Sequence, residues 1–148
     1  MNKYMEQALE EAKKAFEIGE IPVGAVIVNN GEIIAKCHNH CEMLNDATAH
    51  AEMLCIKDAC KKLGEKYLAD CEMYVTLEPC AMCTGAIINS RIKRLYIGAP
   101  DKKTGSCGSK IDIISPNYFN HMPEVYHGIM EDECSELITS FFENLRKK

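Results

Sequence analysis

Two short motifs, well separated along the chain, restrict it to folds that bring them together. The first contains His50 and Glu52 in the order His-x-Glu, and the second contains Cys80 and Cys83 in the order Pro-Cys-x-x-Cys. Imidazole nitrogen and cysteine sulfur are preferred zinc ligands, and a structural zinc normally takes four protein ligands. Three good ligands and one carboxylate therefore indicate a hydrolytic metal site with an open coordination position.

Hydrophobic periodicity predicts an alternation of helices and strands. Helices are predicted over residues 3–18, from Asp46 or Thr48 to Gly64, from Pro79 through Ile87, and across the apolar positions 134–145. Strands are predicted at 21–28, 32–37, 73–77, 93–98 and 125–127, with a loop at 99–109. This order predicts an α/β fold with helices packed over a central sheet. Both metal-ligand motifs then begin helices, where the helix dipole favours the thiolate form.

Length and composition predict one soluble domain spanning 1–148. The chain has 148 residues, of which 47% are hydrophobic and 26% charged, the balance of an ordinary globular protein. No segment approaches the roughly 18 apolar residues of a membrane-spanning helix. The first residues enter a charged amphipathic pattern without the apolar core of a secretory signal. We therefore expect a cytoplasmic protein with no membrane association.

The cysteine pattern argues against a disulfide framework. The count of nine is odd and the spacing is irregular, so we expect most thiols to be reduced. Cys55, Cys60, Cys71 and Cys134 have apolar neighbours and are interpreted as small buried hydrophobes. The segment 37–41 also contains Cys and His residues, but neighbouring residues of a strand point to opposite faces. This segment is therefore interpreted as a strand end entering a loop, with Asn39 as its member of interest.

Three other interpretations of the motifs remain open on the sequence alone. The two cysteines could form a redox pair. A closed structural zinc site could recruit Cys107 or another cysteine as its fourth ligand. His50 could be a core histidine that binds no metal. Convergence of the two motifs in space, without a fourth ligand from the chain, would distinguish the hydrolytic site from these interpretations.

Glu52 is the candidate proton carrier. Residues two positions apart do not face the same way in a regular helix, so Glu52 and His50 can share a site only at the tip of the helix. This geometry suits a carboxylate that approaches a water molecule and does not bind the metal. Zinc lowers the pKa of its water toward about 7, and Glu52 would carry a proton from that water to a ring nitrogen and then to a departing amine.

These residues resemble the cytidine deaminase-like superfamily, whose base deaminases carry the same His-x-Glu and Pro-Cys-x-x-Cys signature. Within it, the chain is similar to the bacterial adenosine deaminases that make inosine at the wobble position of tRNA. The likeness covers almost the whole chain, through the segments 19–26, 38–39, 46–52, 77–83, 85–88, 90–92, 98–101, 103–105, 108–109, 120–121, 133–134 and 141–142. The loop from Lys103 to Ser109 and the Phe141-Phe142 pair favour the tRNA branch.

The resemblance implies a three-layer αβα fold with a central mixed sheet of about five strands. It implies one Zn²⁺ per subunit on His50, Cys80 and Cys83, with Glu52 as the proton shuttle. It further implies contacts to the substrate from Asn39, Val28, Ala49, Asp101, Lys103, Phe141 and Phe142. The expected partners are a second copy of the chain and the anticodon stem-loop of tRNA, read as a single-stranded loop.

The expected reaction is conversion of the wobble adenosine to inosine, with an ACG anticodon of arginine tRNA as substrate. A free nucleobase or nucleotide deaminase of guanine or cytosine type is the alternative enzyme. An inactive zinc-stabilised RNA-binding subunit is disfavoured by the intact Glu52. The net charge of −5 opposes phosphate binding, but basic residues gather locally at 91–94, 102–103 and 146–148.

Overall fold

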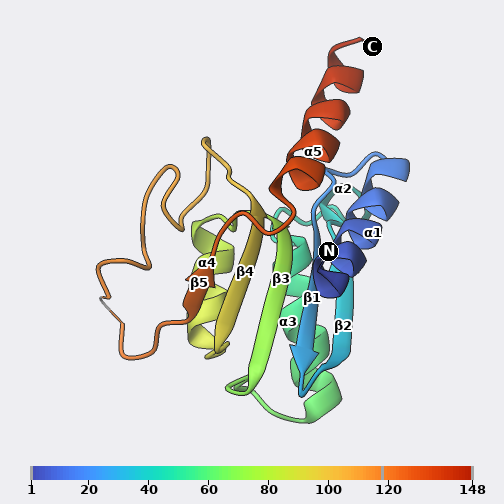
Figure 1. Ribbon diagram of the computed structural model, residues 1–148. Coiled ribbons are helices and arrows are strands. Elements are labelled where there is room, and N and C mark those ends of the chain that lie inside the picture. Colours follow the sequence, from blue (N-terminus) through green and yellow to red (C-terminus); the bar gives the residue numbers. More distant parts are fainter. Residues whose placement is uncertain (1, 118, 148) are drawn as a thin grey trace.

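Five strands form one mixed sheet in the order β2-β1-β3-β4-β5 (Figure 1). The computed structural model describes residues 2–117 and 119–147. The strands are β1 (Gly24–Asn29), β2 (Glu32–His38), β3 (Cys71–Leu77), β4 (Arg94–Ala99) and β5 (Glu124–Tyr126). Strand β1 is antiparallel to both β2 and β3, whereas β3, β4 and β5 are parallel. The number of strands and the mixed sheet agree with the prediction.

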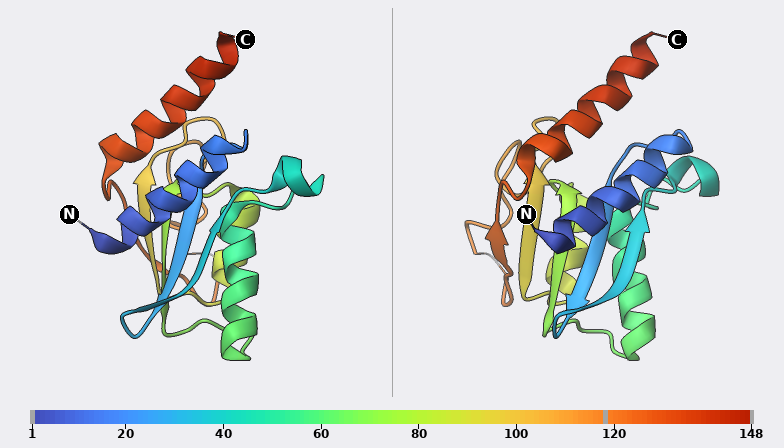
Figure 2. Two further views of the ribbon diagram at one scale, coloured as in Figure 1. Left: turned by 90° about the vertical axis from the view of Figure 1, so that its right-hand side faces the viewer. Right: turned by 45° about the vertical axis from the view of Figure 1, so that its right-hand side comes forward.

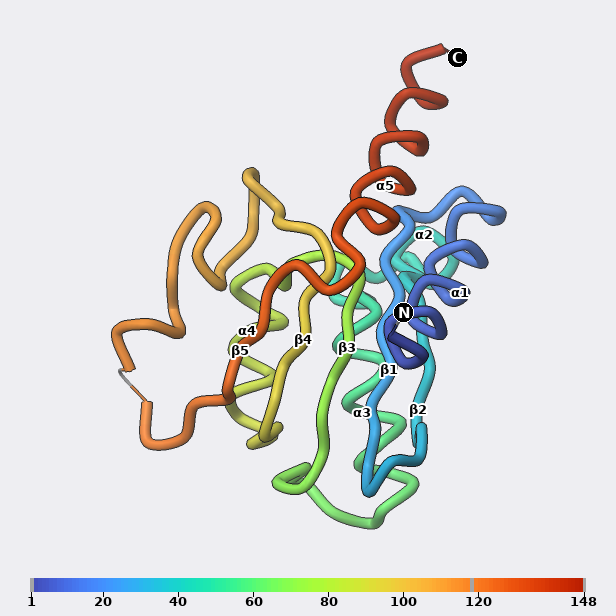
Figure 3. The backbone as a smooth tube through the Cα atoms, in the orientation of Figure 1, coloured from blue at the N-terminus to red at the C-terminus, as the bar shows by residue number. Residues whose placement is uncertain are grey.

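Helices cover both faces of this sheet. Helices α1 (Lys3–Glu17) and α5 (Glu131–Arg146) lie on one face, and α3 (Ala51–Leu63) and α4 (Ala81–Asn89) lie on the other (Figure 2). A single turn of helix, α2 (Cys41–Leu44), follows β2. The described residues between β4 and β5 form no long helix or strand, and this part of the chain loops outward beside α4 (Figure 3).

The apolar run of β1 is explained by burial on both faces. Ala25 and Ile27 belong to the core cluster that includes α3 and α4 residues, whereas Val26 and Val28 belong to the cluster under α1 and α5. Alternate side chains of a strand point to opposite faces, so a strand covered on both sides is apolar throughout. Strand β1 is therefore an interior strand of the sheet, covered by helices on both faces.

Several predicted boundaries were wrong by a few residues. Strand β1 begins at Gly24, after Ile21, Pro22 and Val23. Helix α3 begins at Ala51 because Asp46 forms a local turn, accepting hydrogen bonds from the Thr48 N–H and hydroxyl. The third predicted helix begins at Ala81 with Cys80 as its N-cap, so Pro79 precedes it. Helix α2 was not predicted.

Gly24 allows α1 to pack directly against the sheet. A Cβ atom at this position would lie 2.0 Å from the Ala8 carbonyl oxygen and 2.6 Å from the Ala12 nitrogen, both of them backbone atoms of α1. Backbone cannot move aside as the end of a flexible side chain can. Close packing at this point therefore requires glycine.

We expect Gly24→Ala to lower the free energy of unfolding by about 3 kcal/mol, the upper part of the usual range for overpacking. Gly85→Ala is the matched control, because a Cβ atom at this position of α4 would have no neighbour within 4 Å. That change should raise stability by about 0.5–1 kcal/mol, the helix preference of alanine over glycine. Urea unfolding of the two variants checks both values, and equal stabilities would contradict the packing argument.

All nine cysteines are free thiols, and Cys55, Cys71 and Cys134 are buried as expected. Cys60 is partly buried and packs against the core cluster under α3 and α4. Among the described residues, no helix combines the length and apolar character needed to cross a membrane.

Candidate metal centre

The two sequence motifs converge on one point. The Nδ1 atom of His50 lies 3.6 Å from the Cys80 sulfur and 3.5 Å from the Cys83 sulfur. One ligand atom from each of the three residues lies within 4.8 Å of the other two. An imidazole nitrogen and two sulfurs at these separations can hold one metal ion.

Two helix starts bring the ligands together. His50 is the N-cap residue of α3, with an extended backbone, and Cys80 is the N-cap residue of α4. Cys83 lies one turn further along α4 and is fully buried. Both helices lie on the same face of the sheet and their first turns meet beside the end of β3 (Figure 1). The positive ends of two helix dipoles therefore point at the site and stabilise thiolates.

The two thiols and His50 shift one another's pKa values. A hydrogen bond from Cys83, assisted by His50, lowers the pKa of Cys80 to about 4. The same neighbouring sulfur, together with burial, raises the pKa of Cys83. The hydrogen bond to Cys80 raises the pKa of His50. The lowered pKa of Cys80 favours its thiolate form, which is the form that binds a metal.

Glu52 lies in the first turn of α3 with 3% of its surface exposed. Burial raises the pKa of its carboxyl group to about 7, while the charge of His50 and a hydrogen bond with Cys83 act in the opposite direction. A carboxyl group with a pKa near neutrality can both accept and donate a proton. Its contact with a ligand sulfur places this proton carrier beside the metal position.

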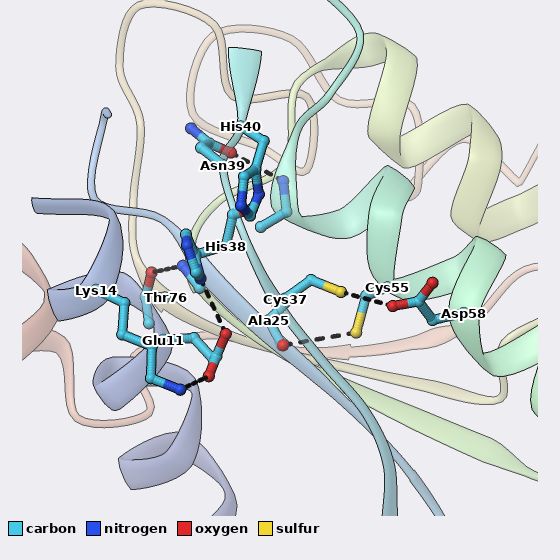
Figure 4. A network of polar contacts seen from close by, with 12 residues as sticks. Glu11, Lys14, Ala25, Cys37, His38, Asn39, His40, Cys55, Asp58 and Thr76 are labelled. Atoms are coloured by element: carbon cyan, nitrogen blue, oxygen red, sulfur yellow. Dashed lines mark hydrogen bonds and ion pairs between the residues drawn. The ribbon is translucent and has the colours of Figure 1, made fainter. Parts of the chain in front are cut away.

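Asn39 connects β2 to the start of α3. Its Oδ1 atom accepts a hydrogen bond of 2.8 Å from the Ala51 N–H, so it satisfies the start of α3 from the segment that follows β2 (Figure 4). Along β2, Cys37 points to Asp58 of α3 and His38 points to Glu11 of α1. The end of β2 is thus attached to both helical layers. Among the described residues, the Asn39 Nδ2 amide has no acceptor and remains available to a ligand.

The alternative metal arrangements are not supported within the described residues. Cys107 does not join the three-residue group, and its sulfur lies 3.5 Å from the Thr84 hydroxyl. His38 and His40 stack on each other and form no group of three ligands with Cys37 and Cys41. A site with three ligands from the chain is the arrangement that the geometry offers.

Glu78, directly before the second motif, is a buried residue for which the sequence analysis predicted no role. It is 2% exposed and its carboxylate accepts hydrogen bonds from the N–H groups of Asp101, Cys107 and Ser109 at 3.0–3.2 Å. These contacts fix the loop 101–109 next to the metal ligands. The available sequence signal was only an acidic residue directly before Pro79.

Three of the predicted substrate residues lie around this centre. Ala49 precedes His50, is 2% exposed, and accepts a hydrogen bond from the His40 N–H through its carbonyl. Asp101 begins the loop held by Glu78, and its carboxylate accepts hydrogen bonds from the Lys103 N–H and the Thr104 hydroxyl. The Lys103 side chain is exposed.

The structure does not bring the remaining three predicted substrate residues close to the metal ligands. Val28 is 1% exposed and packs in the cluster under α1 and α5, so it has no surface to offer a substrate. Phe141 is 6% exposed, with its ring 5.6 Å from that of Phe16. Phe142 on the same helix is 39% exposed.

Known proteins are similar to this chain over nearly its whole length. The model of the MafB19-like deaminase family matches residues 1–146. The tRNA-specific adenosine deaminase of Bacillus subtilis (strain 168) is 50% identical over 145 residues, which are 98% of this chain and 90% of that protein. The tRNA-specific adenosine deaminase of Aquifex aeolicus (strain VF5) is 52% identical over 143 residues, 97% of this chain and 94% of that one.

A solved structure from a study of A-to-I editing by tRNA:A34 deaminases has the same fold. It superimposes with a TM-score of 0.87 at 47% sequence identity, covering 90% of this chain and 97% of that chain. This match confirms the predicted three-layer fold.

Proposed function

Because the chain belongs to the family of tRNA-specific adenosine deaminases, we propose that it converts the wobble adenosine of tRNA to inosine. The proposed substrate is arginine tRNA with an ACG anticodon. In the reaction, the oxygen of water bonds to C6 of adenine, the bond from C6 to the exocyclic nitrogen breaks, and ammonia leaves. The observation that carries the proposal is the convergence of His50, Cys80 and Cys83 beside the buried Glu52.

The donor set fits one zinc ion per subunit. His50 supplies nitrogen and the two cysteines supply sulfur, the ligand types that zinc prefers. No other His, Cys, Asp or Glu among the described residues joins these three, which leaves a coordination position for a non-protein ligand. When bound, zinc supplies Lewis-acid activation of water at neutral pH.

Glu52 is the proposed proton carrier. Its carboxylate accepts a proton from the attacking water and delivers it to N1 of the adenine ring. The remaining water proton passes through the same carboxyl group to the departing amine, so Glu52 ends the cycle as it began. The pKa of about 7 supports both transfers.

Asn39 and Ala49 are proposed to hold the flipped base. An adenine drawn out of the anticodon loop can be read by hydrogen bonds to its edge. The free Nδ2 amide of Asn39 is a suitable donor, because its Oδ1 is already committed to the Ala51 N–H. The same residue thereby links substrate binding to the start of the helix that carries Glu52.

The RNA surface is proposed to include Asp101, Lys103 and the exposed Phe142. Lys103 lies on the loop beside the metal centre, where phosphate binding needs a cation. Phe142 can stack on an unpaired base, and the buried Phe141 supports it through an edge contact at 5.4 Å. Arg94 contributes less, since Glu72 and Glu124 already pair with it. Lys148 of the terminal basic cluster lies outside the described residues.

Two copies of the chain are proposed to form a homodimer whose joint surface holds the anticodon stem-loop. Family membership is the main support. The adjacent Met43 and Leu44 of α2 are 62% and 57% exposed, and such side chains are suited to burial against a second copy. A tRNA substrate also supports a cytoplasmic location.

We expect the zinc-loaded protein to form inosine at the first anticodon position of arginine tRNA bearing ACG. Mass spectrometry of digested tRNA detects the product. A tRNA with a GCG anticodon is the matched control, because it differs only in lacking the target adenosine. Free guanine, cytosine and adenosine are incubated in parallel. Deamination confined to a free base would contradict the proposal and favour the nucleobase deaminase alternative.

A further inference from the structure

We propose that Glu78 is a positioning residue that holds the loop 101–109 in the conformation that binds RNA beside the metal centre. The inference rests on the proposed function, because it assigns Glu78 a role in RNA binding and none in the chemical step. Glu78 is 2% exposed, and no cation pairs with it among the described residues. A buried carboxylate without a counter-ion needs several hydrogen-bond donors to be stable.

The loop supplies those donors from both of its ends. Oε1 accepts hydrogen bonds from the Asp101 N–H at 3.2 Å and from the Ser109 hydroxyl. Oε2 accepts from the Cys107 N–H at 3.0 Å and from the Ser109 N–H at 3.1 Å. One carboxylate therefore closes the loop at its first and last residues. Hydrogen bonds to an ionised acceptor are stronger than neutral ones, which suits this role.

The middle of the loop is packed against the same carboxylate. A Cβ atom at Gly105 would lie 2.5 Å from both Cδ and Oε2 of Glu78. The loop backbone can approach the carboxylate only because residue 105 has no side chain. Contact along the loop and hydrogen bonds at its ends thus fix one conformation.

The loop is coupled to the metal ligands through the next residue of the chain. The Ser106 N–H donates a hydrogen bond of 2.9 Å to the carbonyl oxygen of Pro79, which separates Glu78 from Cys80. Asp101 in turn accepts hydrogen bonds from the Lys103 and Thr104 N–H groups. Cys80 is thus connected through the chain to Glu78, whose carboxylate contacts Asp101. Asp101 in turn contacts Lys103.

Glutamine cannot reproduce these contacts. An amide has one acceptor oxygen and one donor NH₂ group, whereas both carboxylate oxygens of Glu78 receive an N–H. The substituted glutamine side chain is best oriented with its oxygen toward the N–H groups of Cys107 and Ser109. Its NH₂ group then faces the Asp101 N–H. The Ser109 hydroxyl can reverse and accept, but the Asp101 N–H loses its partner. The Asp101 end of the loop should therefore loosen.

We expect Glu78→Gln to raise the KM for an anticodon stem-loop RNA by at least about tenfold while kcat stays within about threefold of wild type. This split is the sign of lost binding with intact chemistry. Zinc content should stay at one per chain. Ser109→Ala removes one hydroxyl donor and leaves the carboxylate, so KM should rise by only about threefold. Glu65→Gln, at an exposed position, is the matched control and should change nothing.

Amide hydrogen exchange measures the loop without any substrate. In Glu78→Gln, residues 101–109 should exchange faster by at least about tenfold, while β3 and α3 keep wild-type protection. Unchanged exchange in the loop, or loss of zinc with an equal fall in kcat and kcat/KM, would overturn the inference. If the wild-type protein makes no inosine, the proposed function fails, and the exchange rates still decide whether Glu78 holds the loop.

Discussion

We expect Glu52→Gln to lower the rate of inosine formation by about 1000-fold, within the range that positioned acid–base groups contribute. Glutamine has nearly the same shape as glutamate but cannot take a proton from water at neutral pH. Glu52 is buried and is not one of the three ligand residues, so zinc should remain bound. Single-turnover assays on an anticodon stem-loop RNA measure the rate, and elemental analysis measures zinc.

The exposed Glu65→Gln is again the matched control, because it makes the same chemical change away from the site. Its rate should equal that of wild type. Normal turnover by zinc-loaded Glu52→Gln would remove Glu52 from the mechanism and require another proton carrier.

Cys83→Ser has the second large expected effect, a loss of both bound zinc and activity. Cys83 is fully buried and is one of only two sulfurs in the group, and a hydroxyl is a much weaker zinc ligand than a thiolate. We expect less than about a tenth of the wild-type zinc content after dialysis, with inosine below detection. Elemental analysis and the tRNA assay give the two readings.

Cys60→Ser is the control for this prediction, since Cys60 is a partly buried cysteine outside the ligand group. It should keep full zinc content and activity. Full activity of Cys83→Ser without zinc would contradict a metal-dependent reaction.

Long periodic segments made most of the fold predictable. Helices α1 and α5 and the apolar strand β1 were placed to within a few residues because packing on a sheet imposes their apolar periods. Helix α2 has only four residues, too few for any period. The start of α3 was misplaced because the Ala51 N–H is satisfied by Asn39, twelve positions earlier in the segment after β2, and not by a side chain directly before the helix.

Those parts of the site were predictable in which the residue type alone indicates the chemical role. His50, Cys80 and Cys83 are good zinc ligands in any context, and the structure brings them together. Glu78 escaped prediction because its partners are mainly backbone N–H groups, which every loop possesses. Val28 was expected to contact the substrate from the resemblance alone, whereas the structure buries it in the cluster under α1 and α5.

The coordination of the bound metal tests the central claim most directly. X-ray absorption at the zinc edge of the active protein should show two sulfurs at about 2.3 Å, one imidazole nitrogen at about 2.0 Å and one further oxygen. That oxygen should exchange with solvent, as an open hydrolytic site requires. A third sulfur or a second imidazole in the shell would show a closed structural site and contradict the account.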